Sequence, residues 1–570
     1  MKNVWKSELQ LPDYPANLAR MLRTNAERFS ELPVYQEVHD KHYVPLLWKQ
    51  FENDIIAIQN WLLNAGLQNR DRVAILSRNR REMLELEMAV MALGGVAVPI
   101  FSGYPSENAD YLVRFCNPRV VAVSDQEQYD KLRRPGEFAH LIHFSELSET
   151  RSGNLVPFAD ILNQRGELTE IRDPAVPHYQ VCLMMYTSGT MGKPKCVRLT
   201  HRNILSQQAA MRVLWNLHSG DRFLSYLPWH HSFGGIFEKY AALTNGAVLS
   251  LEHGFGKDID VLIDNWRRVL PTVFFSVPRI YQELVTRAMQ DPEIDRLIFH
   301  EELRFIFTAA APLPKNISDL FVQRGIPVIE GWGLTETSPC CTVTDPDEPR
   351  IPGVVGKPIP GVSLKIAPDG EILVKGPNVM AGYYHNPTTT REVFTADGWF
   401  KTGDVGAFTN AGLRLISRKD RIFKLSNAEK VVPTEIENLV IRDCAYLAHA
   451  YVAESGRDYP VALLFPNKTM FSQIPDESRL KTGCQHPRTL PDLARCLRNC
   501  LRALNTGLDP KYYRLNSVML LDRELSIENE ELTPSLKLAP NVVGKVFKAH
   551  IEALYGTESS LSDKVYVIQL

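Results

Sequence analysis

Residues 183–195 read Leu-Met-Met-Tyr-Thr-Ser-Gly-Thr-Met-Gly-Lys-Pro-Lys, and this stretch gives the strongest indication of the fold. The apolar run 183–186 predicts a short buried strand. The turn after it offers glycine backbone, hydroxyl groups and lysines, which together suit a polyphosphate. The residues of the turn with this expected role are Thr187, Ser188, Gly189, Thr190, Gly192, Lys193 and Lys195.

The turn is not a Walker A loop. That motif has four residues between its glycines and a Ser or Thr after the lysine, whereas here two residues separate Gly189 from Gly192 and Pro194 follows Lys193. A turn of this composition also occurs on many protein surfaces. Its interpretation therefore depends on the rest of the chain.

Short β-rich runs alternate with amphipathic stretches on both sides of this strand. The predicted strands are 72–76, 96–101, 120–124, 183–186, 223–227, 248–251, 273–277, 305–309 and 327–330. Residues 54–65 and 81–92 place apolar side chains three and four positions apart and predict helices. The alternation is typical of parallel sheets covered by helices, in which ligands bind at the carboxyl ends of the strands.

The pattern changes after about Val362, where short runs joined by glycine turns predict antiparallel strands. Beyond Asp420, two predicted strands and a helix at 490–504 indicate a smaller unit. The expected fold class is therefore α/β. We predict a large N-terminal domain, residues 1–418, of parallel-rich sheets covered by helices plus a small barrel-like sheet, and a smaller mobile α+β C-terminal domain, residues 419–570.

Composition excludes several classes of protein. The 570 residues are 44% hydrophobic and 23% charged, which is typical of a large globular protein and not of a disordered chain. A net charge of −2 gives no overall field that favours nucleic acid. The nine cysteines do not indicate a disulfide framework, and neither a signal peptide nor a membrane-spanning stretch is evident. We expect a cytoplasmic protein that binds no nucleic acid.

Three further motifs follow the turn in order: Gly331-Trp332-Gly333-Leu334-Thr335-Glu336-Thr337, Thr402-Gly403-Asp404 and Arg418-Lys419-Asp420. With these motifs the chain, from about Leu18 to Tyr555, resembles the adenylate-forming superfamily of acyl-CoA synthetases, luciferases and peptide-synthetase adenylation domains. It is most similar to long-chain fatty acid CoA ligases. The resemblance implies that the protein uses ATP and Mg²⁺ to activate a carboxylic acid, with CoA as cosubstrate.

The resemblance also implies roles for single residues. The turn at 187–195 would hold the β- and γ-phosphates and release pyrophosphate. Thr335 would hydrogen-bond the α-phosphate, and Glu336 would help to hold Mg²⁺, a hard cation that prefers oxygen ligands. Asp404 and Arg418 would bind the ribose hydroxyls.

Other matched positions surround the base and the acid. Trp332 and Gly333 would lie at the adenine, with the Trp332 ring stacked on it. Ala310 belongs to a small-residue loop along which the base would lie. His231, in Leu-Pro-Trp-His-His, matches a histidine near the acyl and phosphate ends of the site.

The C-terminal region contains two candidates for the catalytic lysine. Lys537, in Glu-Leu-Thr-Pro-Ser-Leu-Lys-Leu, resembles the long-chain acyl-CoA synthetase variant of the lysine motif, whereas Lys545 mimics the commoner Gly-Lys motif. We favour Lys537, whose charge would bridge the acyl oxygen and the α-phosphate. Asp420 matches the hinge about which relatives rotate the small domain.

Two departures from the family pattern affect the second half-reaction. Arg421 stands where relatives usually have an acid, and Ala428 stands where they usually have a glycine against which pantetheine runs. A methyl group at that position narrows the space for the thiol. Thioester formation nevertheless stays the leading expectation.

The expected reaction is activation of a medium- or long-chain fatty acid to acyl-AMP, followed by transfer to CoA. The alternatives are delivery of the acyl group to a carrier protein or another acceptor, ring closure of a β-hydroxy acid, aryl-CoA ligation, and a binding protein that has lost catalysis. Peripheral membrane contact, the identity of the acid and the oligomeric state stay open.

Overall fold

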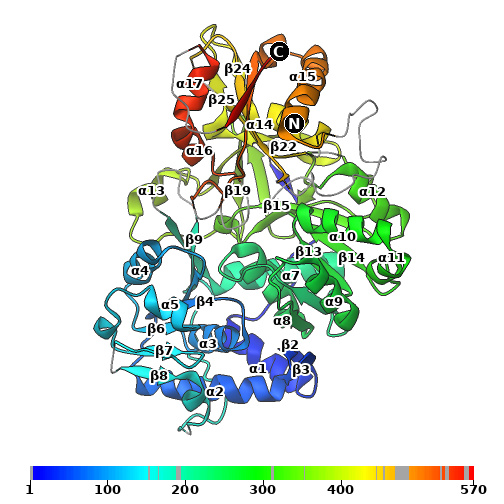
Figure 1. Ribbon diagram of the computed structural model, residues 1–570. Helices are drawn as coiled ribbons and strands as arrows, with labels where there is room; N and C mark the ends of the chain where they lie inside the picture. The colour runs from blue at the N-terminus through cyan, green and yellow to red at the C-terminus, as the bar shows by residue number, and fades with distance from the viewer. Residues whose placement is uncertain are drawn as a thin grey trace. The chain divides into compact units, whose positions relative to one another are not determined.

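The computed structural model describes residues 4–151, 154–164, 166–187, 194–309, 313–351, 353–444, 446–453, 456–468, 487–526, 529–532, 538–556 and 564–570. They form a mixed α/β architecture with two large sheets, as the alternation of strands and helices predicts (Figure 1). The chain divides into two compact units. The first comprises Met1–Ile366, Leu373–Thr402 and Phe408–Leu413, and the second comprises Ala367–Ile372, Gly403–Ala407 and Arg414–Leu570.

An eight-stranded sheet lies in the first unit, with strand order β20-β10-β9-β5-β4-β6-β7-β8. Its strands are β4 (Arg72–Ser77), β5 (Val96–Phe101), β6 (Val120–Val123), β7 (Leu141–His143), β8 (Leu155–Pro157), β9 (Val181–Thr187), β10 (Lys195–Thr200) and β20 (Gly382–Tyr383). The run from β9 through β5 to β8 is parallel, and β10 is antiparallel to both of its neighbours. Strand β9, which leads into the phosphate turn, thus lies inside the sheet between β10 and β5.

A nine-stranded sheet has the order β17-β16-β15-β14-β13-β11-β12-β2-β3. Its strands are β2 (Pro33–His39), β3 (His42–Leu47), β11 (Arg222–Ser225), β12 (Val248–Leu251), β13 (Val273–Ser276), β14 (Phe305–Thr308), β15 (Val328–Gly333), β16 (Cys340–Val343) and β17 (Lys357–Pro358). The strands from β2 to β15 run parallel. Their central residues are buried Val, Ile, Leu and Phe, which is typical of sheets covered on both faces.

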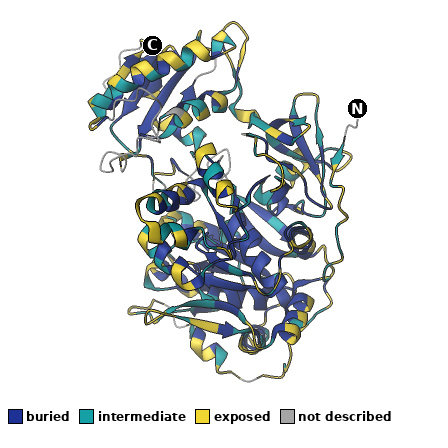
Figure 2. Ribbon diagram, turned by 90° about the vertical axis from the view of Figure 1, so that its right-hand side faces the viewer, coloured by how far each residue is buried: buried dark blue, intermediate teal, exposed yellow. Residues whose placement is uncertain are grey.

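Helices pack on both sheets. They are α1 (Leu18–Phe29), α2 (Trp48–Asn64), α3 (Arg81–Ala92), α4 (Ser106–Phe115), α5 (Gln126–Asp130), α6 (Phe158–Leu162), α7 (His201–Trp215), α8 (Lys239–Asn245), α9 (Ile259–Val269), α10 (Pro278–Gln290), α11 (Pro292–Ile298), α12 (Lys315–Gln323) and α13 (Pro387–Glu392). Helices α3 and α4 contact the eight-stranded sheet, and α8 and α9 contact the nine-stranded one. Figure 2 shows the buried residues in the strands and the exposed ones on the outer helix faces and loops.

Helix α7 begins where its cap dictates. The Thr200 hydroxyl accepts the N–H of Asn203 at 3.2 Å, and the Asn203 side chain accepts the N–H of Thr200 at 2.8 Å. This reciprocal cap satisfies two N–H groups that the helix itself leaves unpaired. It fixes the start of α7 directly after β10.

A five-stranded sheet has the order β1-β18-β19-β21-β22, with β1 antiparallel to β18, and corresponds to the predicted barrel-like sheet. Its strands are β1 (Trp5–Lys6), β18 (Ser363–Ile366), β19 (Glu371–Lys375), β21 (Phe400–Thr409) and β22 (Gly412–Arg418). The Trp5 ring stacks on Phe408 with centroids 4.0 Å apart. This contact packs β1 against β21.

The second unit contains its own core. A four-stranded sheet, β25 (Leu447–Ala453), β26 (Val461–Pro466), β27 (Ser517–Leu521) and β28 (Val565–Gln569), packs with α14 (Pro433–Asp443), α15 (Leu490–Gly507), α16 (Pro540–Val546) and α17 (Lys548–Leu554). A small hairpin joins β23 (Phe423–Lys424) to β24 (Lys430–Val431). Helices α16 and α17 follow each other along the chain and are separated at Phe547.

Candidate functional site

The phosphate turn is flanked by paired strands. Thr187 ends β9, Lys195 begins β10, and the two residues stand opposite each other in the antiparallel ladder. The side chain of Lys195 extends over the ring of Tyr383, with Nζ 5.3 Å from the ring centroid. The ladder therefore brings both ends of the turn together and directs one of its lysines toward β20. The tip of the turn, residues 188–193, is outside the described residues.

Glu336 lies next to the same tyrosine. The Tyr383 hydroxyl donates a hydrogen bond of 2.8 Å to Glu336 Oε1, and the Glu336 carbonyl accepts the N–H of Met380 at 2.9 Å. The tyrosine thus links Glu336 to Lys195, two residues that the sequence places in separate motifs. A phenol hydrogen-bonds the carboxylate without neutralising its charge.

Thr335 contacts the histidine segment. Its hydroxyl is 3.0 Å from the hydroxyl of Ser232, the residue after His231. His231 Nδ1 accepts the N–H of Phe233 at 3.3 Å, and the His231 carbonyl accepts the N–H of Gly235 at 2.7 Å. The structure thus brings the His231 segment and the Thr335 turn into direct contact. The neighbouring His230 packs against the Phe101 ring in a tilted arrangement, with centroids 4.4 Å apart. Burial lowers the pKa of His230 to about 3, so the ring is neutral at neutral pH.

Buried contacts fix the segment that carries His231. The Asn79 side chain accepts the N–H of Trp229 and donates to the Leu227 carbonyl, both at 2.8 Å. Lys239 Nζ lies 5.2 Å from the Trp229 ring centroid and 2.6 Å from Glu87, and both side chains of this ion pair are fully buried. Burial lowers the pKa of Lys239, and the Glu87 carboxylate opposes that shift. A buried charge pair is costly to break, so it holds this region rigidly.

The Gly331-Trp332-Gly333 segment at the end of β15 requires both of its glycines. A Cβ atom at Gly333 would lie 1.7 Å from the Pro339 carbonyl oxygen, and one at Gly331 would lie 2.5 Å from the Phe307 ring. Asn378 closes the turn by donating to the carbonyls of Thr337 at 3.0 Å and Cys340 at 3.1 Å. These close approaches position the residues between Gly331 and Cys340. Trp332 is buried within β15.

A second cluster lies in the second unit. Arg418 Nη1 donates to Asp404 Oδ1 at 2.9 Å, and Arg418 Nε is 3.8 Å from Asp420 Oδ1. The backbone N–H of Gly403 donates to Glu371 at 3.0 Å. The structure therefore brings together the Asp404 and Arg418 side chains that the motifs single out.

Lys419 completes this cluster. Its ammonium lies 2.6 Å from Asp369 and 2.7 Å from Glu371. The hydrogen bonds that Lys419 donates to Asp369 and Glu371 raise the pKa of Lys419, and the first of these bonds lowers the pKa of Asp369. These two ion pairs thereby fix the position of Lys419, directly before Asp420, within the second unit.

The hinge candidate and the departures from the family pattern lie together in sequence. Asp420 is exposed, whereas the Arg421 guanidinium is largely buried between Glu437 and the Tyr451 ring, 4.9 Å from its centroid. Ala428 has a φ of 69°, in the left-handed region that favours glycine. The backbone thus keeps a conformation suited to glycine although the residue is alanine.

Several predicted site residues fall outside the described residues, and the structure gives no account of them. They are Ser188, Gly189, Thr190, Gly192, Lys193, Ala310 and Lys537. The rival lysine, Lys545, lies in α16. The choice between Lys537 and Lys545 therefore stays a prediction.

Tyr383, Ser232 and Asn378 contact the predicted residues but are missed by the sequence motifs. Tyr383 follows Gly382 in an ordinary short strand, and only the pairing of β20 with β10 brings it to Lys195. Ser232 follows the histidine directly, and this adjacency is the one signal by which it could have been found. Long-range pairing cannot be derived from one sequence.

Glu336 fits a role in holding a divalent cation. Its Oε1 accepts one hydrogen bond, and Oε2 has no protein partner among the residues that the structure describes. No cluster of three or more His, Cys, Asp or Glu side chains suited to a metal occurs in the described ranges. A cation at Glu336 would therefore complete its ligands with phosphate and water oxygens, as Mg²⁺ commonly does.

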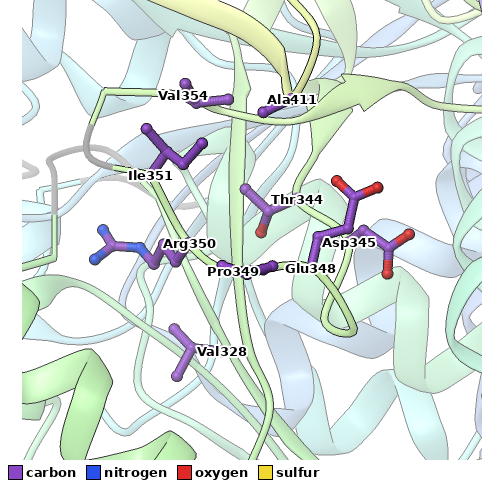
Figure 3. A pocket seen from close by; sticks show the side chains of 9 residues that line it. All are labelled: Val328, Thr344, Asp345, Glu348, Pro349, Arg350, Ile351, Val354 and Ala411. Carbon is purple, nitrogen blue, oxygen red and sulfur yellow. The ribbon is translucent and has the colours of Figure 1, made fainter.

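A separate shallow cavity lies elsewhere in the first unit (Figure 3). It is lined by Val328, Thr344, Asp345, Glu348, Pro349, Arg350, Ile351, Val354 and Ala411. The Arg350 guanidinium binds Glu330 at 2.6 Å. None of the predicted site residues lines this cavity. In the described part of the chain, no helix is long and apolar enough to cross a membrane.

Family comparisons match both parts of the chain. A family model described as "AMP-binding enzyme" matches residues 22–384, and one described as "AMP-binding enzyme C-terminal domain" matches residues 420–559. Among curated proteins, the long-chain-fatty-acid–CoA ligase FadD15 of Mycobacterium bovis is 27% identical, covering 95% of this chain and 97% of its own. The human long-chain-fatty-acid–CoA ligase 1 is 27% identical, covering 91% of this chain and 83% of its own.

Solved structures agree in fold. ATP-bound MatB from Rhodopseudomonas palustris superposes with a TM-score of 0.75 at 24% identity, covering 94% of this chain and 99% of that one. An anthranilate CoA ligase, AuaEII, solved with anthranoyl-AMP, has a TM-score of 0.75 at 21% identity. At these identities the likeness shows the fold alone.

Proposed function

Because the chain belongs to the AMP-binding enzyme family, we propose that it activates a medium- or long-chain fatty acid and transfers the acyl group to CoA. In the first half-reaction a carboxylate oxygen attacks the ATP α-phosphorus, and pyrophosphate leaves. In the second, the CoA thiolate attacks the acyl carbon and AMP leaves. The names of the curated relatives support the fatty acid and the CoA acceptor.

The observation that carries this proposal is the contact set of the first unit. Lys195, Tyr383 and Glu336 are linked in one row, and the Thr335 hydroxyl contacts Ser232 beside His231. Adenylation brings two anions together, so cationic and hydroxyl donors must offset their repulsion. We propose that Thr335 and His231 donate at the α-phosphate and the carboxylate.

Glu336 would hold Mg²⁺, which when bound neutralises phosphate charge. We propose that the turn at 187–195 holds the β- and γ-phosphates through Thr187, Ser188, Thr190, Lys193 and Lys195 and the backbone of Gly189 and Gly192. Trp332, Gly333 and Ala310 would bind the base. The support for these roles is the family match, which spans all of these positions.

In the second unit, Asp404 would accept both ribose hydroxyls. Its ion pair with Arg418 compensates the carboxylate charge while leaving lone pairs for those bonds. Arg418 would donate to the same ribose. We propose a domain boundary between residues 418 and 419 with Asp420 as the hinge, which the separate C-terminal match from residue 420 supports.

The catalytic lysine supplies the experiment. We expect Lys537→Ala to abolish acyl-adenylate formation while leaving ATP binding largely intact, because the lysine acts on charge that develops in the transition state. Lys545→Ala is the matched control and keeps adenylation. The reverse outcome would assign the role to Lys545. Mass spectrometry of products with and without CoA tests the acceptor, because an adenylate that accumulates despite CoA contradicts the ligase.

A further inference from the structure

Gln207 is a buried side chain with half of its hydrogen-bonding capacity unused. It lies on α7, is fully buried, and its Oε1 accepts the N–H of Cys340 at 2.9 Å. Its amide nitrogen, Nε2, is buried and has no partner in the described structure. An N–H donor left unpaired in the interior is unfavourable, so such a group commonly marks a place where a partner binds.

The position of Gln207 connects it to the proposed acid site. Cys340 pairs with Gly333 across the β15–β16 ladder, two residues before Thr335. Cys340 Sγ also borders Gly331, where an added Cβ would lie 3.3 Å from it and 2.5 Å from the Phe307 ring. Gln207 therefore lies beside the turn that carries Thr335.

The next residue ties α7 to the histidine segment. Gln208 Nε2 donates to the carbonyls of Ile236 at 2.9 Å and Phe237 at 3.4 Å, both in η2 (Phe233–Glu238). This segment starts directly after Ser232, which contacts Thr335. Phe233 and Phe237 contact the Phe307 ring with centroids 5.7 and 4.9 Å apart. Gln207 and Gln208 thus connect α7 to the β15–β16 turn and to η2, respectively.

We propose that Gln207 is a specificity-determining residue whose Nε2 donates to an oxygen on the body of the acid, so that the preferred substrate carries a hydroxyl or oxo group. This inference rests on the proposed function, which places the acid's carboxylate at Thr335 and His231. The body of the acid would extend from there toward the rings of Phe233, Phe237 and Phe307. An unsubstituted acid leaves the amide unpaired, and sites built to hydrogen-bond a substrate reject analogues that lack the group.

The test compares straight-chain acids of one length, either unsubstituted or carrying a hydroxyl or oxo group at successive positions along the chain. Acid-dependent pyrophosphate release is measured for each. We expect at least one oxygenated acid to exceed the unsubstituted acid in kcat/KM by about tenfold or more. In Gln207→Leu we expect this ratio to fall to near one.

Two further variants separate recognition from folding. Gln207→Glu keeps an acceptor for the Cys340 N–H but removes the amide donor. We therefore expect its ratio of kcat/KM for the oxygenated acid to that for the unsubstituted acid to fall to near one as well. Gln208→Leu breaks contacts to η2 and lowers the rates for both kinds of acid together, so the ratio stays. Equal use of all acids by the wild type, or an unchanged ratio in both Gln207 variants, overturns the inference. Absence of activity with every acid contradicts the proposed function instead.

Discussion

The carboxylates of the two clusters differ in their partners. Glu336, in the first unit, is held by the neutral Tyr383 hydroxyl, whereas Asp404, in the second unit, is paired with the Arg418 guanidinium. A carboxylate held by a phenol keeps its charge for a cation, while one held by guanidinium offers lone pairs with its charge already compensated. The first suits a metal–phosphate role, and the second suits recognition of neutral hydroxyls.

Removing the charge of Glu336 gives the largest expected effect. In Glu336→Gln the side chain still hydrogen-bonds Tyr383 but no longer attracts a divalent cation. We expect acid-dependent ATP–pyrophosphate exchange to fall by about a hundredfold or more. The matched control is Glu348→Gln, an exposed carboxylate paired with Lys357 away from the site, which keeps the wild-type rate. A comparable loss in both variants would contradict a specific role.

Removing the charge of Asp404 affects binding more than rate. Asp404→Asn replaces an anionic acceptor by a neutral one and removes the ion-pair partner that lies 2.9 Å from Arg418. We expect the KM for ATP to rise by about ten- to a hundredfold with little change in kcat, since charge-assisted hydrogen bonds to ribose are weakened. Steady-state kinetics with ATP varied measure this split. A fall in kcat at unchanged KM would contradict a ribose role.

The phenol itself is expected to matter less. Tyr383→Phe keeps the ring under Lys195 but removes the donor to Glu336. A hydrogen bond to a charged group contributes about 1.5 kcal/mol or more, so we expect a loss of about tenfold in exchange rate. A loss as large as that of Glu336→Gln would show that the hydroxyl acts directly, and the comparison of the two carboxylates would then fail.

The contribution to the pH dependence of stability should also differ between His201 in the first unit and the Lys419–Asp369 ion pair in the second unit. Burial lowers the pKa of His201 from 6.5 to about 4. The unfolded chain therefore takes up a proton that the folded state refuses, and stability falls as the pH drops below 6.5, by about 2 kcal/mol at pH 5. The Lys419 ion pair lowers the pKa of Asp369 below 3.8, so that pair persists over this range.

Thermal unfolding between pH 7 and pH 5 tests this prediction, with His201→Gln as the comparison variant. The glutamine can still accept the Leu18 N–H that His201 Nδ1 accepts. The His201→Gln variant should therefore lose less stability than the wild type between pH 7 and pH 5. An equally steep loss in the variant would assign it to other groups.

Backbone conformation gives the smallest expected effect. Ala428 has a φ of 69°, so Ala428→Gly should raise stability by roughly 0.5–1 kcal/mol. Ala494→Gly, within α15, should lower stability by a similar amount. Denaturant unfolding followed in the second unit compares the two. Destabilisation by both changes would contradict the strain at Ala428.

The sequence predicts the sheets well because their strands are apolar and their turns glycine-rich. The strands Val96–Phe101 and Val248–Leu251 and the helix Arg81–Ala92 have the predicted bounds. The helix predicted at 490–504 starts at the predicted residue but extends to Gly507. Local periodicity identifies elements, but it does not place their ends.

The candidate site is likewise only partly predictable from local sequence patterns. The motifs single out Thr335, Glu336, Asp404 and Arg418 because their order and spacing are distinctive. Contacts such as Tyr383 with Glu336 and Gln207 with Cys340 join residues far apart in sequence, at 47 and 133 positions. Pairing of β20 with β10 and the placement of α7 produce these contacts, and no local pattern encodes them.

The most direct test measures acid-dependent ATP–pyrophosphate exchange in Glu336→Gln and Asp404→Asn as ATP is raised to saturation. If Glu336 holds the metal and Asp404 binds the ribose, exchange in Asp404→Asn returns close to the wild-type rate, because only nucleotide binding is weakened. Exchange in Glu336→Gln stays low. Recovery of both variants, or of neither, would contradict the assignment of metal–phosphate chemistry to Glu336 and ribose recognition to Asp404.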